Sequence, residues 1–155
     1  MQKNHGKGKM KGMEQKGIKP EKLRSLIGRA MEQLALSYAP YSHFHVAAAL
    51  LCEDGAVFTG CNIENASYSA TNCAERTAFF KAVSEGRRSF SCIVIAGGRD
   101  GKTVEYCPPC GVCRQVMREF CDPSKFQVVL ARSLEDYKVF LLEELLPESF
   151  GPDTL

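Results

Sequence analysis

Two short cysteine-containing motifs constrain this chain more than any other feature. The first is Cys73-Ala74-Glu75 and the second is Pro109-Cys110-Gly111-Val112-Cys113. Three thiolates can occupy three corners of a tetrahedral zinc site, and the fourth corner then stays open to water. Any fold of this chain must therefore bring two segments that are distant in sequence to one point, with the carboxylate of Glu75 beside them.

The length of the chain suits a single domain. It has 155 residues, of which 45% are hydrophobic, enough for one buried core. We expect the domain to span residues 20–150, after a basic, disordered extension over residues 1–19 and before a short tail over residues 151–155. No apolar run approaches the roughly 18 residues that a membrane span needs, and the N-terminal segment has no apolar signal core. The sequence therefore predicts a cytoplasmic protein with no membrane partner.

The cysteine content agrees with this location. Eight cysteines in a chain without a secretion signal are expected to be thiols and metal ligands, not a disulfide framework. Four of them are expected to pack as small apolar residues: Cys52, Cys61, Cys92 and Cys121.

The net charge of +2 is unevenly distributed along the chain. Residues 1–19 contain six lysines and one glutamate, a balance of +5, so the remaining residues carry −3. A mildly acidic body argues against a groove that follows phosphates, and we expect no nucleic-acid partner. The basic extension is expected to be solvated, and we assign no function to it.

Hydrophobic periodicity predicts helices that alternate with strands. Helical spacing is found at residues 20–37, 73–85 and 111–120. Strand patterns are found at residues 45–52, 56–62, 92–97 and 127–131, with an edge strand at 137–140 before residues 141–146. Asp54-Gly55 predicts a hairpin turn between the first two strands. This order predicts an α/β fold of three layers, α-β-α, around a five-stranded mixed sheet, with strands joined through helices running parallel.

Both cysteine motifs fall where a predicted helix begins. A helix N-terminus presents free N–H groups and partial positive charge, which lowers the pKa of a thiol and stabilises a thiolate ligand. Three thiolates overcharge a divalent ion by one, so a neighbouring cation would help, and Arg76 follows Glu75 directly. Glu75 is the group expected to carry a proton for the water at the metal.

Three further segments accompany the zinc motif in a fixed order, namely residues 38–44, 60–68 and 143–147. With them, the chain resembles the short-chain cytidine deaminase family from about Leu23 to Phe150. The resemblance implies hydrolysis of cytidine and deoxycytidine to uridine and deoxyuridine with release of ammonia, in pyrimidine salvage. It also implies a homotetramer with one zinc ion (Zn2+) per subunit.

The resemblance further implies roles for the residues of the zinc motif. Zinc would be held by Cys73, Cys110 and Cys113. Glu75 would take a proton from the attacking water, pass it to ring N3 and then help to protonate the departing amine. Arg76 would hydrogen-bond the ligand thiolates.

Six residues are implied to contact the substrate: Phe44, Asn62, Glu64, Tyr68, Ala74 and Phe150. Asn62 and Glu64 would hold the ribose 3'-hydroxyl, because an amide and a carboxylate suit sugar hydroxyls. Phe44 would pack against the pyrimidine, and Phe150 would reach into the site of a neighbouring subunit. A carboxylate at the sugar favours nucleosides over 5'-nucleotides.

Two alternatives remain open at this point. Cys107 could act as a fourth thiolate, which would close the coordination sphere and make the chain a structural zinc scaffold instead of an enzyme. Pro108-Pro109 argues against this, because the two prolines hold Cys107 in an extended segment. A blasticidin-type or other cytosine-ring deaminase, acting on nucleic acid for example, would share the zinc motif. The segment 62–65 and the acidic body favour a free nucleoside.

Overall fold

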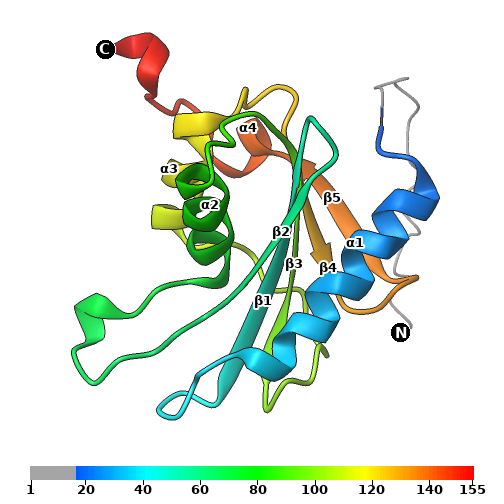
Figure 1. Ribbon diagram of the computed structural model, residues 1–155, viewed down its shortest axis with the longest axis vertical. Coiled ribbons are helices and arrows are strands. Elements are labelled where there is room, and N and C mark those ends of the chain that lie inside the picture. Colours follow the sequence, from blue (N-terminus) through cyan, green and yellow to red (C-terminus); the bar gives the residue numbers. More distant parts are fainter. Residues whose placement is uncertain (1–16) are drawn as a thin grey trace, which may run out of the picture.

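The structure, a computed structural model, describes residues 17–155 and contains one five-stranded sheet in the order β2-β1-β3-β4-β5 (Figure 1). The strands are β1 (Phe44–Cys52), β2 (Val57–Cys61), β3 (Phe90–Arg99), β4 (Gln127–Ala131) and β5 (Tyr137–Leu141). Strands β3 and β4, which α3 joins, pair in parallel, and the other neighbouring pairs are antiparallel. The predicted mixed sheet of five strands is confirmed.

Helices cover both faces of the sheet and complete the three predicted layers (Figure 1). Helix α1 (Pro20–Gln33) packs on one face, and α2 (Ala74–Ser84) and α3 (Gly111–Phe120) pack on the other. Shorter turns of helix are η1 (Leu34–Leu36), η2 (Tyr68–Ala70), α4 (Leu142–Leu145) and η3 (Pro152–Thr154). Both cysteine motifs therefore lie on the same side of the sheet.

The continuous apolar run of β1 is explained by this layered packing. Successive residues of a strand point to opposite faces of the sheet. Ala48 and Leu50 face the α2 and α3 side, whereas Ala49 and Leu51 face α1. Because both faces of β1 are covered, no polar residue interrupts its central part.

The first predicted helix differs most from the structure. The spacing predicts a helix over residues 20–37, but α1 ends at Gln33 and the chain continues as the 3-10 turn η1. The last buried side chain of α1 is Ala30, Met31 is partly buried against the same cluster, and Leu36 is 68% exposed. The apolar spacing therefore stops packing on the sheet near the end of α1. The other predicted elements agree within two residues at each end, and the hairpin turn at Asp54-Gly55 is present, with Gly55 at a φ of 88°.

The position of α2 depends on a close approach at Gly60 of β2. A Cβ atom added to Gly60 would overlap the carbonyl oxygen of Ala74 and the backbone nitrogen of Ala78. Only glycine leaves room for the first turn of α2 to cross β2 at this distance. This contact fixes where the helix begins, and therefore where Cys73 and Glu75 lie.

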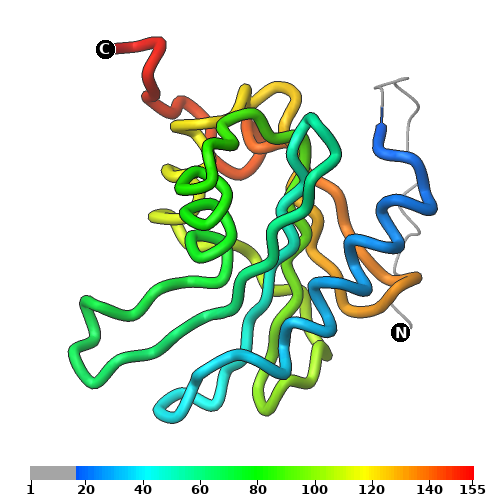
Figure 2. The backbone as a smooth tube through the Cα atoms, viewed as in Figure 1, coloured from blue at the N-terminus to red at the C-terminus, as the bar shows by residue number. Residues whose placement is uncertain are grey.

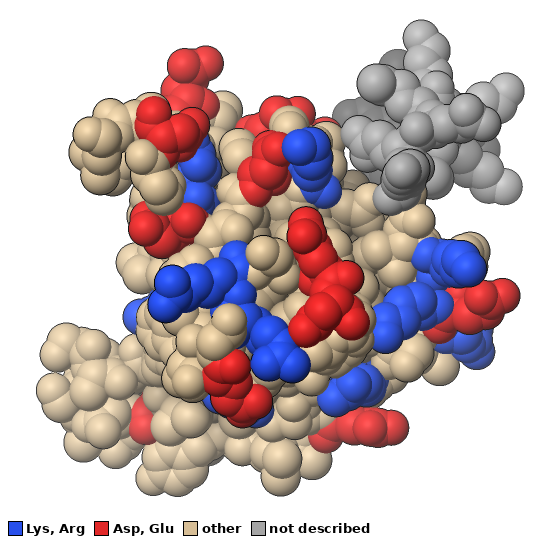
Figure 3. Space-filling view, turned by 45° about the horizontal axis from the view of Figure 1, so that its top comes forward, with Lys and Arg blue, Asp and Glu red and all other residues tan. Residues whose placement is uncertain are grey.

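On the face that Figure 3 displays, acidic and basic side chains are interspersed. Among the described residues, no helix combines the length and apolar character needed to cross a bilayer. The predicted disordered extension, residues 1–19, lies outside the described residues except for residues 17–19. Of these, Ile18 packs against the apolar cluster under α1.

Candidate metal centre

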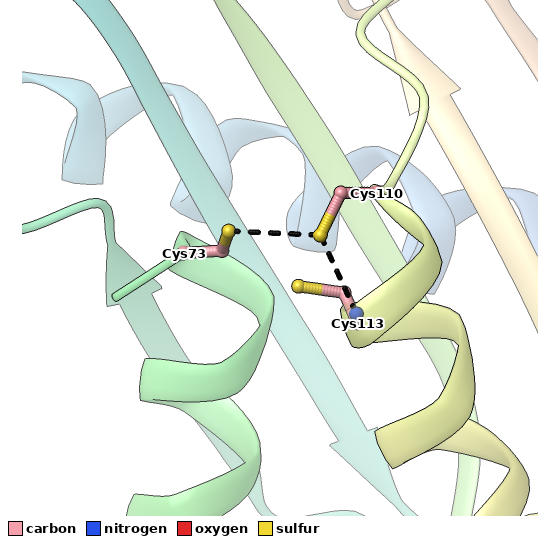
Figure 4. Close-up of side chains that lie close together, drawn as sticks. All are labelled: Cys73, Cys110 and Cys113. Carbon is pink, nitrogen blue, oxygen red and sulfur yellow. Dashed lines mark hydrogen bonds between the residues drawn. The ribbon is translucent and has the colours of Figure 1, made fainter. Parts of the chain in front are cut away.

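Three cysteine thiols point into the space between the N-termini of α2 and α3 (Figure 4). Cys73 is the N-cap of α2, Cys110 is the N-cap of α3, and Cys113 lies in the first turn of α3. All three sulfurs lie within 4.8 Å of one another, and those of Cys73 and Cys110 are 3.8 Å apart. Two sulfurs bound to a tetrahedral zinc ion at about 2.3 Å lie about 3.8 Å apart, so this donor set fits zinc.

Local hydrogen bonds hold the second motif in shape. The backbone N–H of Cys113 donates to the Cys110 sulfur at 3.5 Å. The Arg114 side chain donates to the carbonyl oxygens of Pro109 at 2.8 Å and Leu145 at 2.7 Å, which fixes the peptide that enters Cys110. Sequence reasoning did not identify Arg114. The sequence feature that could have identified it is an arginine placed directly after a candidate thiol ligand.

Arg76 provides positive charge beside the thiols. Its guanidinium Nη2 donates to the Cys73 sulfur at 3.4 Å. The pKa of Cys73 is held at about 5, first by the hydrogen bond from the Cys113 thiol and then by the guanidinium of Arg76. The structure therefore places Arg76 where it can offset the excess negative charge of three thiolates.

Glu75 is buried in the first turn of α2, with 4% of its surface exposed. Burial, with a smaller contribution from the negative charge of Cys73, raises the pKa of its carboxyl to about 7. No lysine or arginine forms an ion pair with it in the described part of the chain. A carboxyl group with a pKa near neutrality can both accept and donate a proton at physiological pH.

Asn62 fixes the start of β1. Its side-chain oxygen accepts hydrogen bonds from the backbone N–H of Val46 at 2.9 Å and from the Ser37 hydroxyl. Its amide nitrogen donates to the carbonyl oxygen of Phe44 at 2.8 Å. A primary amide has two N–H donors, so one remains for a ligand. Asn62, a predicted substrate contact, thus also holds the backbone that carries Phe44.

Glu64 holds the turn before β1. Its carboxylate accepts from the backbone N–H groups of Tyr41 at 2.8 Å and Ser42 at 3.2 Å, and from the Ser42 hydroxyl. These donors, the hydroxyl first, hold the pKa of Glu64 below its usual range. One oxygen keeps room for a further donor. The sequence analysis assigned no role to Ser37 or to Ser42, although Ser42 lies within the segment 38–44.

The turn at Tyr38–His43 and the long segment between β2 and α2 run beside each other at one end of the sheet (Figure 2). Two pockets, each of about 410 Å³, lie at this end. Phe44 lines the first, with Arg99 and Tyr106, and Tyr68 lines the second, with Glu64. Tyr68 is 80% exposed.

The remaining candidate residues lie as follows. Ala74 is fully buried, and its N–H belongs to the free first turn of α2. Phe150 is 63% exposed in the C-terminal segment, and its own chain leaves the ring uncovered. Cys107 is outside the three-thiol cluster of the described residues, and its sulfur packs over Gly97 instead. The four-thiolate alternative therefore has no geometric support.

Three converging thiols, a buried carboxyl group beside them and a three-layer α/β fold define a zinc-dependent hydrolase of the deaminase class. Residues 20–130 match the family described as the cytidine and deoxycytidylate deaminase zinc-binding region. The chain belongs to this family, and it is a zinc-binding hydrolase.

Individual relatives agree with this membership. A cytidine deaminase of Sporosarcina psychrophila is 48% identical over 135 residues, which are 87% of this chain and 93% of that protein. The crystal structure of cytidine deaminase from Burkholderia pseudomallei has 46% identity and a TM-score of 0.74, over 81% of this chain and 97% of that one. The crystal structure of cytidine deaminase from Mycobacterium tuberculosis has 36% identity and a TM-score of 0.68, over 82% of this chain and 95% of that one.

Replacing Arg76 by glutamine is expected to lower zinc affinity or the turnover rate by about 10- to 100-fold. Losses of this size are typical when a group that hydrogen-bonds a metal ligand is removed. Competition with a chromogenic zinc chelator measures retention. The matched control is Arg87→Gln, which removes an exposed ion pair with Asp54. Equal zinc retention and equal turnover in Arg76→Gln and Arg87→Gln would contradict the role given to Arg76.

Proposed function

We propose that this chain hydrolyses cytidine and deoxycytidine to uridine and deoxyuridine with release of ammonia. In this proposal Cys73, Cys110 and Cys113 hold zinc, and Glu75 carries the protons. The observation that carries the proposal is the convergence of three thiols at two helix N-termini beside a buried carboxyl group. The names of the relatives support the choice of substrate.

The chemistry divides between the metal and the protein. Zinc, when bound, lowers the pKa of the attacking water. Glu75 accepts one proton of that water and delivers it to N3 of the pyrimidine. It then accepts the second proton from the hydroxyl group added at C4 and delivers it to the departing amine, as the C4 carbonyl forms and ammonia leaves. One carboxyl group can serve in both directions because burial in the first turn of α2 raises its pKa from the usual range toward neutrality. Arg76 offsets the thiolate charge.

The nucleoside contacts follow from the donors and acceptors left free at the end of the sheet. The remaining N–H of Asn62 and the remaining acceptor of Glu64 suit the ribose 3'-hydroxyl. Phe44 offers a partly exposed ring to the pyrimidine, and Tyr68 lies in the same pocket as Glu64. The N–H of Ala74 is available to the base. The carboxylate of Glu64 favours nucleosides over 5'-nucleotides.

A direct assay tests this function. Purified protein is incubated with cytidine, deoxycytidine, their monophosphates and blasticidin S, and the absorbance of the amino-pyrimidine is followed. Conversion of both nucleosides, with one ammonia released per product, is the expected result. Loss of absorbance only with blasticidin S would favour the antibiotic deaminase instead, and no change with either nucleoside would overturn the proposal.

The proposal also covers the oligomeric state of the protein and its location in the cell. We infer a homotetramer in which Phe150 of one subunit completes the site of another, because this ring is exposed in a single copy. All eight cysteines are free, which suits a reducing compartment, so we place the enzyme in the cytoplasm in pyrimidine salvage. The catalytic domain is proposed to span residues 20–150.

Glu64→Gln is expected to raise KM for cytidine by about 10- to 100-fold, since a hydrogen bond to a charged group contributes about 1.5–3 kcal/mol. The same variant should change KM for 3'-deoxycytidine far less, because that substrate lacks the hydroxyl group. Steady-state kinetics on both substrates separate this loss from any shift of the Tyr41–Ser42 turn. Equal losses on both substrates would mean that Glu64 acts only by holding the turn.

A further inference from the structure

The C-terminal segment is fastened to helix α3 by a buried arginine. Arg118 lies in the last turn of α3, and its side chain is only 9% exposed. Its Nε donates to the Ser149 hydroxyl at 3.2 Å, and its Nη2 donates to the carboxylate of Asp153. One turn earlier, the Gln115 side chain donates to the carbonyl oxygen of Phe150 at 3.2 Å. Helix α3 therefore contacts the chain both before and after the Phe150 ring.

Gly151 lets the guanidinium approach the backbone. A Cβ atom added to Gly151 would overlap the guanidinium group of Arg118. The φ of Gly151 is −158°, an extended conformation open to any residue, so the glycine provides space and not a special turn. The N–H of Gly151 donates to the Thr154 hydroxyl at 2.9 Å and closes the terminal turn η3. We call Gln115, Arg118, Ser149, Gly151 and Asp153 the C-terminal clamp.

The clamp leaves one large apolar group uncovered. Phe150 is 63% exposed, although the backbone around it is bonded to α3. An exposed ring on an ordered backbone is pre-organised for a partner, because little conformational freedom is then lost on contact. The red C-terminal segment runs outward from the body beyond α4, where another molecule can reach it (Figure 1).

We propose that Arg118 is a positioning residue that holds Phe150 ready to complete the nucleoside site of a neighbouring copy of this chain. The inference rests on the proposed function, in which Phe150 enters that site. Arg118 touches neither substrate nor zinc ligand in this scheme. It acts through the backbone on both sides of Phe150, so its loss should impair substrate binding and leave the proton transfers at Glu75 intact.

Kinetics of four single variants and one double variant test the inference. Phe150→Ala and Arg118→Gln should each raise KM for cytidine by roughly tenfold, with kcat within about twofold, because the ring acts in binding and positioning. Gly151→Ala should act in the same direction, since its methyl group displaces the guanidinium. The double variant Arg118→Gln/Phe150→Ala should show no loss beyond Phe150→Ala alone. Arg87→Gln, an exposed arginine paired with Asp54, is the matched control.

The thermal unfolding midpoint and the zinc content of each variant are measured, so that a loss of folding is distinguished from a loss of Phe150 positioning. If Arg118→Gln does not fold, the test uses Gly151→Ala and Asp153→Asn instead, because the Asp153 side chain is exposed. The inference is overturned if Phe150→Ala raises KM while the clamp variants do not, or if the losses of Arg118→Gln and Phe150→Ala add. In either case the proposed function stands. A parent protein that leaves cytidine unchanged overturns the proposed function and this inference together.

Discussion

Glu75→Gln is expected to lower kcat on cytidine by about 10²- to 10⁴-fold, the range that a positioned acid-base group contributes. The substitution keeps the size of the side chain, so the packing at the start of α2 should survive. The amide cannot take up the proton of the attacking water or return it to the pyrimidine. Because Cys73, Cys110 and Cys113 are unchanged, zinc should stay bound.

Turnover and zinc content measured on the same preparation test this expectation. The control is Glu85→Gln, which changes an exposed glutamate at the other end of the same helix. A kcat within tenfold of the parent would show that Glu75 is not the proton carrier. Loss of zinc together with turnover would assign Glu75 a role in holding the metal.

The second large effect is expected from the thiols. Cys110→Ala should remove zinc and, with it, nearly all turnover, because two remaining thiolates leave the metal site incomplete. Cys110 is the clearest of the three to change, since its exposed side chain leaves no cavity in the core, whereas Cys113 is buried. Atomic absorption and the cytidine assay on the purified variant measure both effects.

Cys107→Ala is the matched comparison. Cys107 lies close in sequence to Cys110 but outside the cluster of three sulfurs, so this variant should retain one zinc per chain and full turnover. Zinc loss in Cys107→Ala equal to that in Cys110→Ala would restore the structural four-thiolate alternative.

Much of this fold could be predicted because its signals are local. The helix at residues 111–120 and the strand at 127–131 are confirmed with the expected bounds. Cysteines that start two helices on one side of a sheet can meet, and the structure brings Cys73, Cys110 and Cys113 together. These features depend on periodicity, caps and turn residues that a short window of sequence contains.

The contacts that organise the site depend on packing between distant segments, and so escaped prediction. Ser37 bonds to Asn62, and Ser42 bonds to Glu64, 22 positions away. Arg118 reaches Ser149 across 31 positions. Serine and arginine are common on surfaces, so nothing local distinguishes these residues until the fold places their partners. The early end of α1 has the same cause, since the sheet decides where its apolar spacing stops packing.

The proposed catalysis requires a zinc site with three thiolates and an open fourth position beside Glu75. X-ray absorption at the zinc edge of the purified protein tests this most directly, because it counts sulfur neighbours. We predict three sulfur ligands and one oxygen or nitrogen ligand, with one zinc per chain. Four sulfur ligands would close the site and contradict the proposed catalytic role of Glu75.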